Sequence, residues 1–186
     1  MSLKSAAEGT RPTAGKVRSA VMNSLQTKIP GARVLDVFAG SGAVGIEALS
    51  RGAALACFVE SGAEAIRALR INLSEVERRS KSLQSAPTIR IFPMTAAKAL
   101  GQQSDCSFDI LWLDPPYAIL TQQWPLLLDD LTRIAAEDAL LVVESDIEAS
   151  AFLKTWASVD EQPWILSKQK IYGKIAVSFF ELRGRT

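Results

Sequence analysis

The fold is decided by the stretch Arg33-Val34-Leu35-Asp36-Val37-Phe38-Ala39-Gly40-Ser41-Gly42-Ala43-Val44-Gly45. Its first six residues are rich in β-branched and aromatic side chains, which predicts a short buried strand. The remainder contains Gly-x-Gly-x-x-Gly, and residues 44–51 have the composition of a helix that Gly52 ends. A strand, a glycine-rich turn and a helix in this order are typical of a nucleotide-binding unit in an α/β protein.

Strands and helices alternate outward from this stretch. The patterns predict strands at 33–38, 55–59, 88–92, 108–113, 139–143, 164–168 and 175–182, and helices at 13–25, 44–51, 62–77, 96–100, 121–135 and 148–156. Five strands separated by helices indicate a doubly wound, mostly parallel sheet of the α/β class. The last two predicted strands have only a short link between them, so we expect them to add an antiparallel edge, for seven strands in all. We expect residues 1–30 to form an arm and helix of the same domain, and residues 31–186 the main body.

The composition narrows the chemistry. The chain has 186 residues, 48% of them hydrophobic, and no histidine. A Ser-His-Asp triad, a Cys-His pair and a histidine-ligated metal are therefore excluded, and no metal site is expected. The two cysteines, Cys57 and Cys106, are interpreted as small buried side chains. With no apolar run near 18 residues, we expect a cytoplasmic protein without a membrane partner.

Charge is balanced overall but not along the chain. Residues 1–33 carry a net charge of +5, residues 34–153 one of −7 and residues 154–186 one of +3. A uniformly basic nucleic-acid binder is excluded, whereas a local phosphate-binding face formed by the basic ends is not. Ordinary solvated side chains are the alternative explanation.

Two carboxylates accompany the glycine turn. Glu60 lies 20 residues after Gly40, at the end of the second predicted strand, where it can accept hydrogen bonds from ribose hydroxyls. This arrangement suits a dinucleotide or S-adenosylmethionine. Asp36 favours the second, because a carboxylate attracts an ammonium and a sulfonium but repels a pyrophosphate. Asp36 as a capping or turn residue is the alternative.

The turn Asp114-Pro115-Pro116-Tyr117 carries the chemical signal. It follows a strong strand, and ligands of open α/β sheets bind at the carboxyl ends of strands. The prolines stiffen the turn and remove two N–H donors, so it offers the Asp114 carboxylate and the Pro115 carbonyl as acceptors. Two acceptors can hold the hydrogens of an exocyclic amine on a nucleobase while Tyr117 stacks on the base. Asp114 or water can take the proton that the amine loses.

These motifs resemble class I S-adenosylmethionine-dependent methyltransferases that act on amino groups, which implies a Rossmann-like fold. The opening Arg11-Pro12-Thr13, the block from Phe38 to Ala53 and the late Tyr172-Gly173 resemble the RsmD family of 16S ribosomal RNA guanine-N2 methyltransferases more closely. The resemblance runs from about residue 11 to residue 182, and the long glycine block is its most specific part. It implies S-adenosylmethionine as the cofactor and ribosomal RNA, free or within a small-subunit particle, as the partner.

The resemblance also implies roles for single residues. Those expected to line the cofactor are Asp36, Phe38, Gly40, Ser41, Gly42, Glu60, Thr95, Ala96 and Asp114, with Glu60 on the ribose and Thr95 and Ala96 against the adenine. The residues from Asp114 to Tyr117 would hold the target guanine. Basic residues of the opening segment, Arg11, Lys16 and Arg18, would contact RNA phosphates. Thr95 stands where the family often has an acid or an amide, so a hydroxyl or backbone groups would hold the adenine amine.

Four other functions stay open at this level. A DNA adenine-N6 or cytosine-N4 methyltransferase shares the Asp-Pro-Pro-Tyr turn but needs an additional element that enters a groove. A protein-glutamine methyltransferase would favour asparagine at position 114. An NAD-dependent oxidoreductase disagrees with Asp36, and a non-catalytic nucleotide-binding module would not need the acceptor turn.

Overall fold

The computed structural model describes residues 12–80, 86–105 and 107–184. It consists of two compact units, the first ending at Thr95 and the second starting at Ala96. Arg11 and Cys106 lie outside the described residues. The expected boundary at residue 30 stays a prediction.

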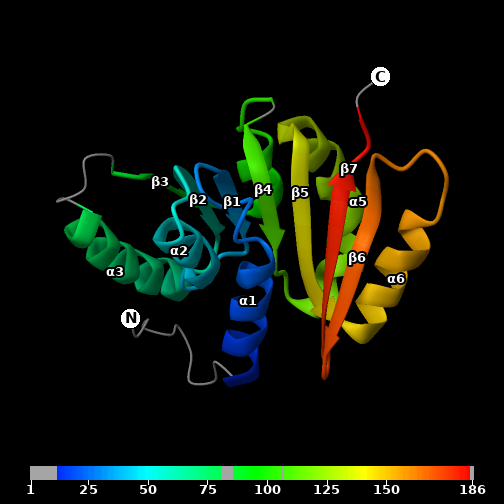
Figure 1. Cartoon of the computed structure of the whole chain (residues 1–186), viewed down its shortest axis with the longest axis horizontal. Coiled ribbons are helices and arrows are strands. Elements are labelled where there is room, and N and C mark those ends of the chain that lie inside the picture. The colour runs from blue at the N-terminus through cyan, green and yellow to red at the C-terminus, as the bar shows by residue number, and fades with distance from the viewer. Residues whose placement is uncertain (1–11, 81–85, 106, 185–186) are drawn as a thin grey trace. The chain divides into compact units, whose positions relative to one another are not determined.

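The first unit contains three parallel strands in the order β3-β2-β1 (Figure 1). These are β1 (Arg33–Val37), β2 (Leu55–Glu60) and β3 (Thr88–Pro93). Val37 lies opposite Val59, and Glu60 lies opposite Pro93. The carboxyl ends of all three strands therefore meet at one edge, which is where the residues expected to bind the cofactor follow them.

Three helices belong to this unit: α1 (Pro12–Ser24), α2 (Ala43–Ser50) and α3 (Ala63–Ser80). Helix α2 packs on β1 and β2, and α1 contacts α2. The contact of α1 includes an ion pair in which Arg18 Nε lies 3.1 Å from Glu47 Oε2. Val17 and Val21 on α1 and Leu25 directly after it recur every four residues, and all three are buried.

The second unit contains four strands in the order β4-β5-β7-β6. Strands β4 (Phe108–Leu113) and β5 (Ala135–Asp146) are parallel, whereas β7 (Ile175–Leu182) runs antiparallel to both β5 and β6 (Trp164–Tyr172). The predicted antiparallel edge is thus confirmed, as is the α/β class with its seven-stranded, mostly parallel sheet.

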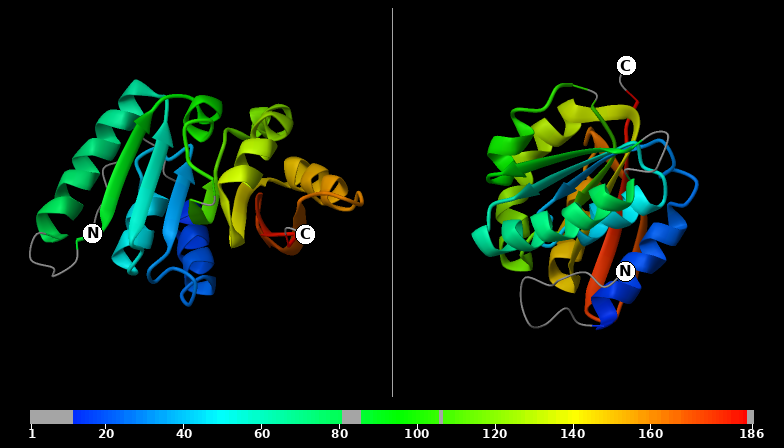
Figure 2. Two further views of the ribbon diagram at one scale, coloured as in Figure 1. Left: turned by 90° about the horizontal axis from the view of Figure 1, so that it is seen from above. Right: turned by 90° about the vertical axis from the view of Figure 1, so that its left-hand side faces the viewer.

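Helices α4 (Ala96–Leu100), α5 (Tyr117–Ile134) and α6 (Ile147–Ala157) complete this unit (Figure 2). Aromatic rings join α5, α6 and β7: the centroid of Trp124 lies 4.9 Å from that of Trp156 and 5.7 Å from that of Phe180. Trp164 Nε1 donates to Thr132 Oγ1 at 3.0 Å. Within the described ranges, no helix has both the length and the apolar character needed to cross a membrane.

Four predicted elements had wrong boundaries. Strand β6 continues to Tyr172 rather than ending at residue 168, because its pairing with β7 extends to Ile175. Helix α5 begins at Tyr117 rather than residue 121, because Pro116 (φ −52°, ψ 123°) ends the turn directly at the helix. The sequence indicated that Pro125 would lie near the start of this helix, where proline is tolerated, but the earlier start places it inside the helix. Strand β5 is longer than the predicted 139–143 because its pairing with β7 continues to Asp146. Helix α3 extends to Ser80. At these positions the local polar residues predicted loops, whereas strand pairing and the start of a helix after proline determined the observed structure.

Cys57 is buried, as predicted, and burial raises the pKa of its thiol to about 11. A thiol with such a pKa carries little thiolate near neutral pH, so Cys57 is a packing residue.

Two helical glycines provide a matched test of packing. A Cβ on Gly45 in α2 would lie 2.6 Å from Phe58 Cζ, whereas a Cβ on Gly15 in α1 would meet nothing within 4 Å. We expect Gly45→Ala to lower the free energy of unfolding by about 1–3 kcal/mol through overpacking. Gly15→Ala should raise it by about 0.5–1 kcal/mol, because alanine favours the helix. Chemical denaturation measures both, and a Gly45→Ala variant as stable as the parent would contradict the tight packing.

Candidate functional site

The backbone after β1 has an unusual conformation. Phe38, Gly40 and Gly42 have positive φ angles of 66°, 56° and 81°. The Ala39 N–H donates to Val59 O at 2.9 Å, and the Gly42 N–H donates to Ala39 O at 2.7 Å. Glycine adopts this region freely, whereas Phe38 is strained there, and such strain persists only where the surroundings determine the conformation. The sequence pattern did not indicate the strain at Phe38.

Asp36 anchors the helix that follows. It is 1% exposed, and its Oδ2 accepts the Gly45 N–H at 2.9 Å. Since α2 has no side-chain cap of its own, Asp36 of β1 satisfies one of the free N–H groups at its N-terminus. The capping alternative for Asp36 is therefore observed directly. Burial raises the pKa of Asp36 to about 7; the Gly45 hydrogen bond opposes the rise, the Glu60 charge adds to it and the Arg18 charge opposes it.

Glu60 holds the turn from β2. Its Oε2 accepts the Gly40 N–H at 2.8 Å, and its Oε1 accepts the N–H groups of Ser61 at 2.8 Å and Gly62 at 2.7 Å. A carboxylate has about four lone-pair positions, so one on Oε2 is left for a ligand hydroxyl. The sequence predicted hydrogen bonds from ribose hydroxyls to Glu60. With three backbone donors in place, one hydroxyl can bind directly, and a second hydroxyl would have to replace one of the backbone N–H groups.

Asn72 is a site residue that the sequence analysis missed. Its Nδ2 donates to Ser41 O at 3.0 Å from α3, and the residue is only 4% exposed. It lies three positions after Leu69 and directly before Leu73, both buried. An amide on the apolar face of a helix is the signal that could have identified it, because buried polar groups need partners.

The three glycines of the motif have different surroundings. A Cβ on Gly42 would clash with the Leu69 side chain, and one on Gly45 with Phe58. Only at Gly40 would a Cβ meet nothing within 4 Å. The positive φ angles favour glycine at positions 40 and 42 whatever the space around them. Packing adds a second reason at position 42 and is the reason at position 45, while the open space at Gly40 allows a ligand to approach the backbone.

Thr95 belongs to the same edge of the first unit. It follows β3 by two residues, is exposed, and comes shortly after Pro93, which pairs with Glu60. Ala96 is buried at the start of α4, in the second unit. The predicted adenine contacts of both residues stay predictions.

The Asp-Pro-Pro-Tyr turn lies at the carboxyl end of β4, as predicted. Asp114 and Pro116 are exposed and Pro115 is buried, while Tyr117 is the first residue of α5. The turn therefore presents its acid at a strand end on a rigid connection of only three residues between strand and helix.

The basic residues on α1 differ in their surroundings. Lys16 is exposed. Arg18 is partly buried against Glu47, whose other oxygen accepts Arg51 Nη2 at 2.7 Å. Arg18 thus has a structural role in attaching α1 to α2, and a contact with phosphate stays a prediction for both residues.

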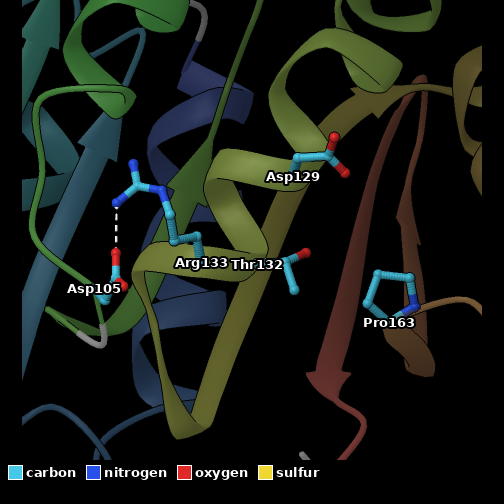
Figure 3. A pocket seen from close by; sticks show the side chains of 5 residues that line it. All are labelled: Asp105, Asp129, Thr132, Arg133 and Pro163. Atoms are coloured by element: carbon cyan, nitrogen blue, oxygen red, sulfur yellow. Dashed lines mark hydrogen bonds and ion pairs between the residues drawn. The ribbon is translucent and has the colours of Figure 1, made fainter.

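A separate depression of about 500 Å³ lies in the second unit (Figure 3). It is lined by Asp105, Asp129, Thr132, Arg133 and Pro163. Arg133 donates to Leu100 O at 3.0 Å, Gln103 O at 2.7 Å and Asp105 Oδ1 at 2.7 Å. These bonds tie α5 to the chain after α4, so Arg133 is a structural residue, and the depression includes none of the predicted site residues. Within the described residues, no cluster of three or more acids and cysteines could hold a metal ion.

Comparison with known proteins gives concordant results. The family model "Conserved hypothetical protein 95" matches residues 2–181. The chain is 32% identical to "Putative rRNA methyltransferase YlbH" of Bacillus subtilis (strain 168), covering 98% of this chain and 94% of the relative. It is 33% identical to "Ribosomal RNA small subunit methyltransferase D" of Escherichia coli (strain K12), over 93% and 80%. The solved structure "Putative methyltransferase yhhF from Escherichia coli" superposes with a TM-score of 0.75 at 30% identity, over 98% of this chain and 92% of that one.

The buried acid predicts a pH dependence of stability. The folded-state pKa of Asp36 is raised from 3.8 to about 7, so its contribution to stability is fully present below pH 3.8 and is lost as the pH rises through 7. Asp36→Asn removes this titration and keeps an oxygen for the Gly45 N–H. We expect the Tm of the variant to rise relative to the parent between pH 5 and pH 8. Asp138→Asn, at an exposed position, is the control. A constant difference for Asp36→Asn across this range would show that Asp36 does not titrate there.

Asn72→Ala tests the third attachment of the glycine turn. The change leaves the Ser41 carbonyl without this donor, and we expect the free energy of unfolding to fall by about 1–3 kcal/mol. Asn23→Ala, at an exposed position of α1, should change it by less than about 0.5 kcal/mol. Equal effects of the two substitutions in urea denaturation would remove Asn72 from the site.

Proposed function

The chain belongs to the RsmD family of methyltransferases, and from this premise we propose that it transfers a methyl group from S-adenosylmethionine to the exocyclic N2 amine of a guanine in 16S ribosomal RNA. The relatives bear the names of ribosomal RNA methyltransferases, which supports the coarser activity, rRNA methylation. The choice of guanine N2 comes from the resemblance in the sequence motifs. We further propose that the enzyme is cytoplasmic and has no membrane partner, because ribosomal RNA is its proposed substrate.

The hydrogen-bonded turn after β1 is the observation that carries the proposal. Asp36, Glu60 and Asn72 hold it from three different elements, at 2.9, 2.8 and 3.0 Å. The open space at Gly40 allows a ligand to approach the backbone, and Glu60 Oε2 retains an acceptor position for a ribose hydroxyl. These features fit S-adenosylmethionine. Asp36 is too buried to be a major contact surface, so we propose that it acts on the cofactor mainly through its negative field and through the position of α2.

When bound, S-adenosylmethionine supplies a methyl group activated by the positive sulfur. The protein contributes position and electrostatics. Glu60 orients the ribose, and the start of α2, with its remaining N–H groups, fixes the path of the turn. Phe38 and Ser41 complete the lining on the β1 side, and Thr95 and Ala96 accommodate the adenine.

We assign the acceptor chemistry to the turn after β4. The Asp114 carboxylate and the Pro115 carbonyl accept the two N–H groups of the amine, which directs the nitrogen lone pair at the methyl carbon. Methyl transfer would form a nitrogen–carbon bond and break the cofactor's sulfur–carbon bond, leaving a neutral thioether, and Asp114 or water would take the proton that the amine loses. Tyr117 stacks on the extruded base, an interaction worth about 1–3 kcal/mol.

Contacts with RNA phosphates are proposed for Arg11, Lys16 and Arg18. Lys16, being exposed, is the better candidate, because Arg18 would have to give up its ion pair with Glu47. Such contacts would make binding weaken with added salt.

Labelled methyl transfer to 16S ribosomal RNA from a strain lacking its own enzyme tests the proposal, with small-subunit particles as a second substrate. We expect N2-methylguanosine as the product. Asp114→Ala should reduce the rate at least about 100-fold while cofactor affinity, measured by calorimetry, changes less than about threefold, because Asp114 acts on the amine. Asp138→Ala, an exposed acid of the same unit, should retain the parental rate.

Each result discriminates. Methylation at an adenine N6 or a cytosine N4, or no transfer to either RNA substrate, would contradict the guanine-N2 assignment. Full activity of Asp114→Ala would remove the turn from the reaction.

A further inference from the structure

The second unit places another carboxylate beside the acceptor turn. Strands β4 and β5 are parallel, and Leu113 pairs with Val143. Leu113 and Val143 are the last pair in this register; Asp114 is the next residue after Leu113, and Glu144 the next after Val143. Neighbouring strands are about 4.8 Å apart, and residues in register on parallel strands share a face of the sheet. Asp114 and Glu144 directly follow this last pair, so both lie at the carboxyl-end edge of neighbouring strands, where the turn begins.

Glu144 is unusual in being buried. It is 7% exposed and lies opposite Val177 of β7. Among the described residues, Asp36 and Glu144 are the two acids classed as buried, and Asp36 caps α2. Acids are rarely buried without a specific purpose, because desolvation of the charge is unfavourable. A buried acid next to a proposed catalytic turn is a candidate for a functional group.

The acceptor turn does not choose the base. An Asp114 carboxylate and a Pro115 carbonyl can hold the exocyclic amine of guanine, adenine or cytosine equally well. What differs is the ring nitrogen beside the amine: N1 of guanine carries a hydrogen, whereas N1 of adenine and N3 of cytosine are acceptors. A second carboxylate directed at this ring nitrogen would bind guanine and repel the other two bases.

We propose that Glu144 selects guanine by accepting a hydrogen bond from its N1–H while Asp114 and Pro115 hold the N2 amine. The inference rests on the proposed function and adds a specificity-determining residue to it. The two carboxylates, on neighbouring strands of one unit, match the two neighbouring donors on one edge of guanine. A recognition site built from paired acceptors discriminates strongly, since a base with an acceptor at that position leaves the carboxylate facing a lone pair.

The test uses 16S ribosomal RNA with either guanosine or 2-aminopurine ribonucleoside at the methylated position, once that position has been mapped. 2-Aminopurine keeps the amine but has an acceptor at N1. We expect the parent enzyme to prefer guanosine at least about 20-fold in kcat/KM, and Glu144→Gln to reduce this preference to about threefold or less, because an amide can accept from or donate to N1. Glu181→Gln, an exposed acid of β7 that lies opposite Leu140 of β5, should keep the parental preference.

The outcomes separate the two proposals. A mapped product other than guanine would overturn the proposed function and this inference with it. Guanine methylation with an unchanged preference in Glu144→Gln would overturn the role of Glu144 alone. The comparison of guanosine with 2-aminopurine in the parent enzyme does not depend on the folding of a variant. Equal rates on these two RNAs would also overturn the role of Glu144. Calorimetry with S-adenosylmethionine should give the same affinity for all three proteins, and a loss confined to Glu144→Gln would assign that residue to the cofactor instead.

Discussion

The hydrogen bond between Asp36 and Gly45 is the interaction on which the rest of the first unit depends. It joins the end of β1 to the third residue of α2, and α2 has no other side-chain cap. The residues between these two anchors, including Phe38, Gly40 and Gly42, must adopt left-handed backbone conformations to connect the strand to the helix. Glu60 and Asn72 then fix the middle of the connection from β2 and α3. The geometry of the turn follows from attachment at both ends rather than from its own sequence.

The turn after β1 is energetically unfavourable in two respects, and its rigidity favours ligand binding. A carboxylate at 1% exposure with a pKa near 7 is only partly ionised at neutral pH, and a phenylalanine at φ 66° is strained. The surrounding packing must offset both the desolvation of Asp36 and the strain at Phe38. Phe58 and Leu69 contribute to this packing, since they fill the space that side chains at positions 45 and 42 would occupy. A rigid turn of this kind reduces the entropy lost when a ligand binds, because its backbone donors are already fixed. Strain and desolvation are thus concentrated where a preformed surface is useful.

Periodicity and turn chemistry were enough to predict the α/β class, the antiparallel edge and most helices. They failed where a residue distant in the sequence determines the local structure or the hydrogen-bond partner. The polar pair Glu137-Asp138 concealed the start of β5, although the strand begins at Ala135 in register with Phe108. Likewise, the sequence offered capping by Asp36 only as an alternative and could not name the capped residue, since Gly45 is distant in the pattern and adjacent only in the fold. Asn72 was missed because its partner is a backbone carbonyl, which no side-chain motif reveals. The glycines illustrate the same limit: their spacing is visible in the sequence, but which of them faces open space is not.

Residues 114 and 144 suggest how such a protein separates reaction from recognition. A stiff turn of acid and prolines suits any exocyclic amine, so it can be kept while the target base changes. The choice of base then falls to a side chain on the next strand, where the sheet register places it without a contribution from a flexible loop. Glu144 is paired with Val177 of β7, and the preceding residue Val143 is paired with Leu113 of β4, so backbone pairing fixes the strand at this position. Discrimination that depends on a single hydrogen atom requires such precision, and a β-sheet supplies it better than a surface loop does.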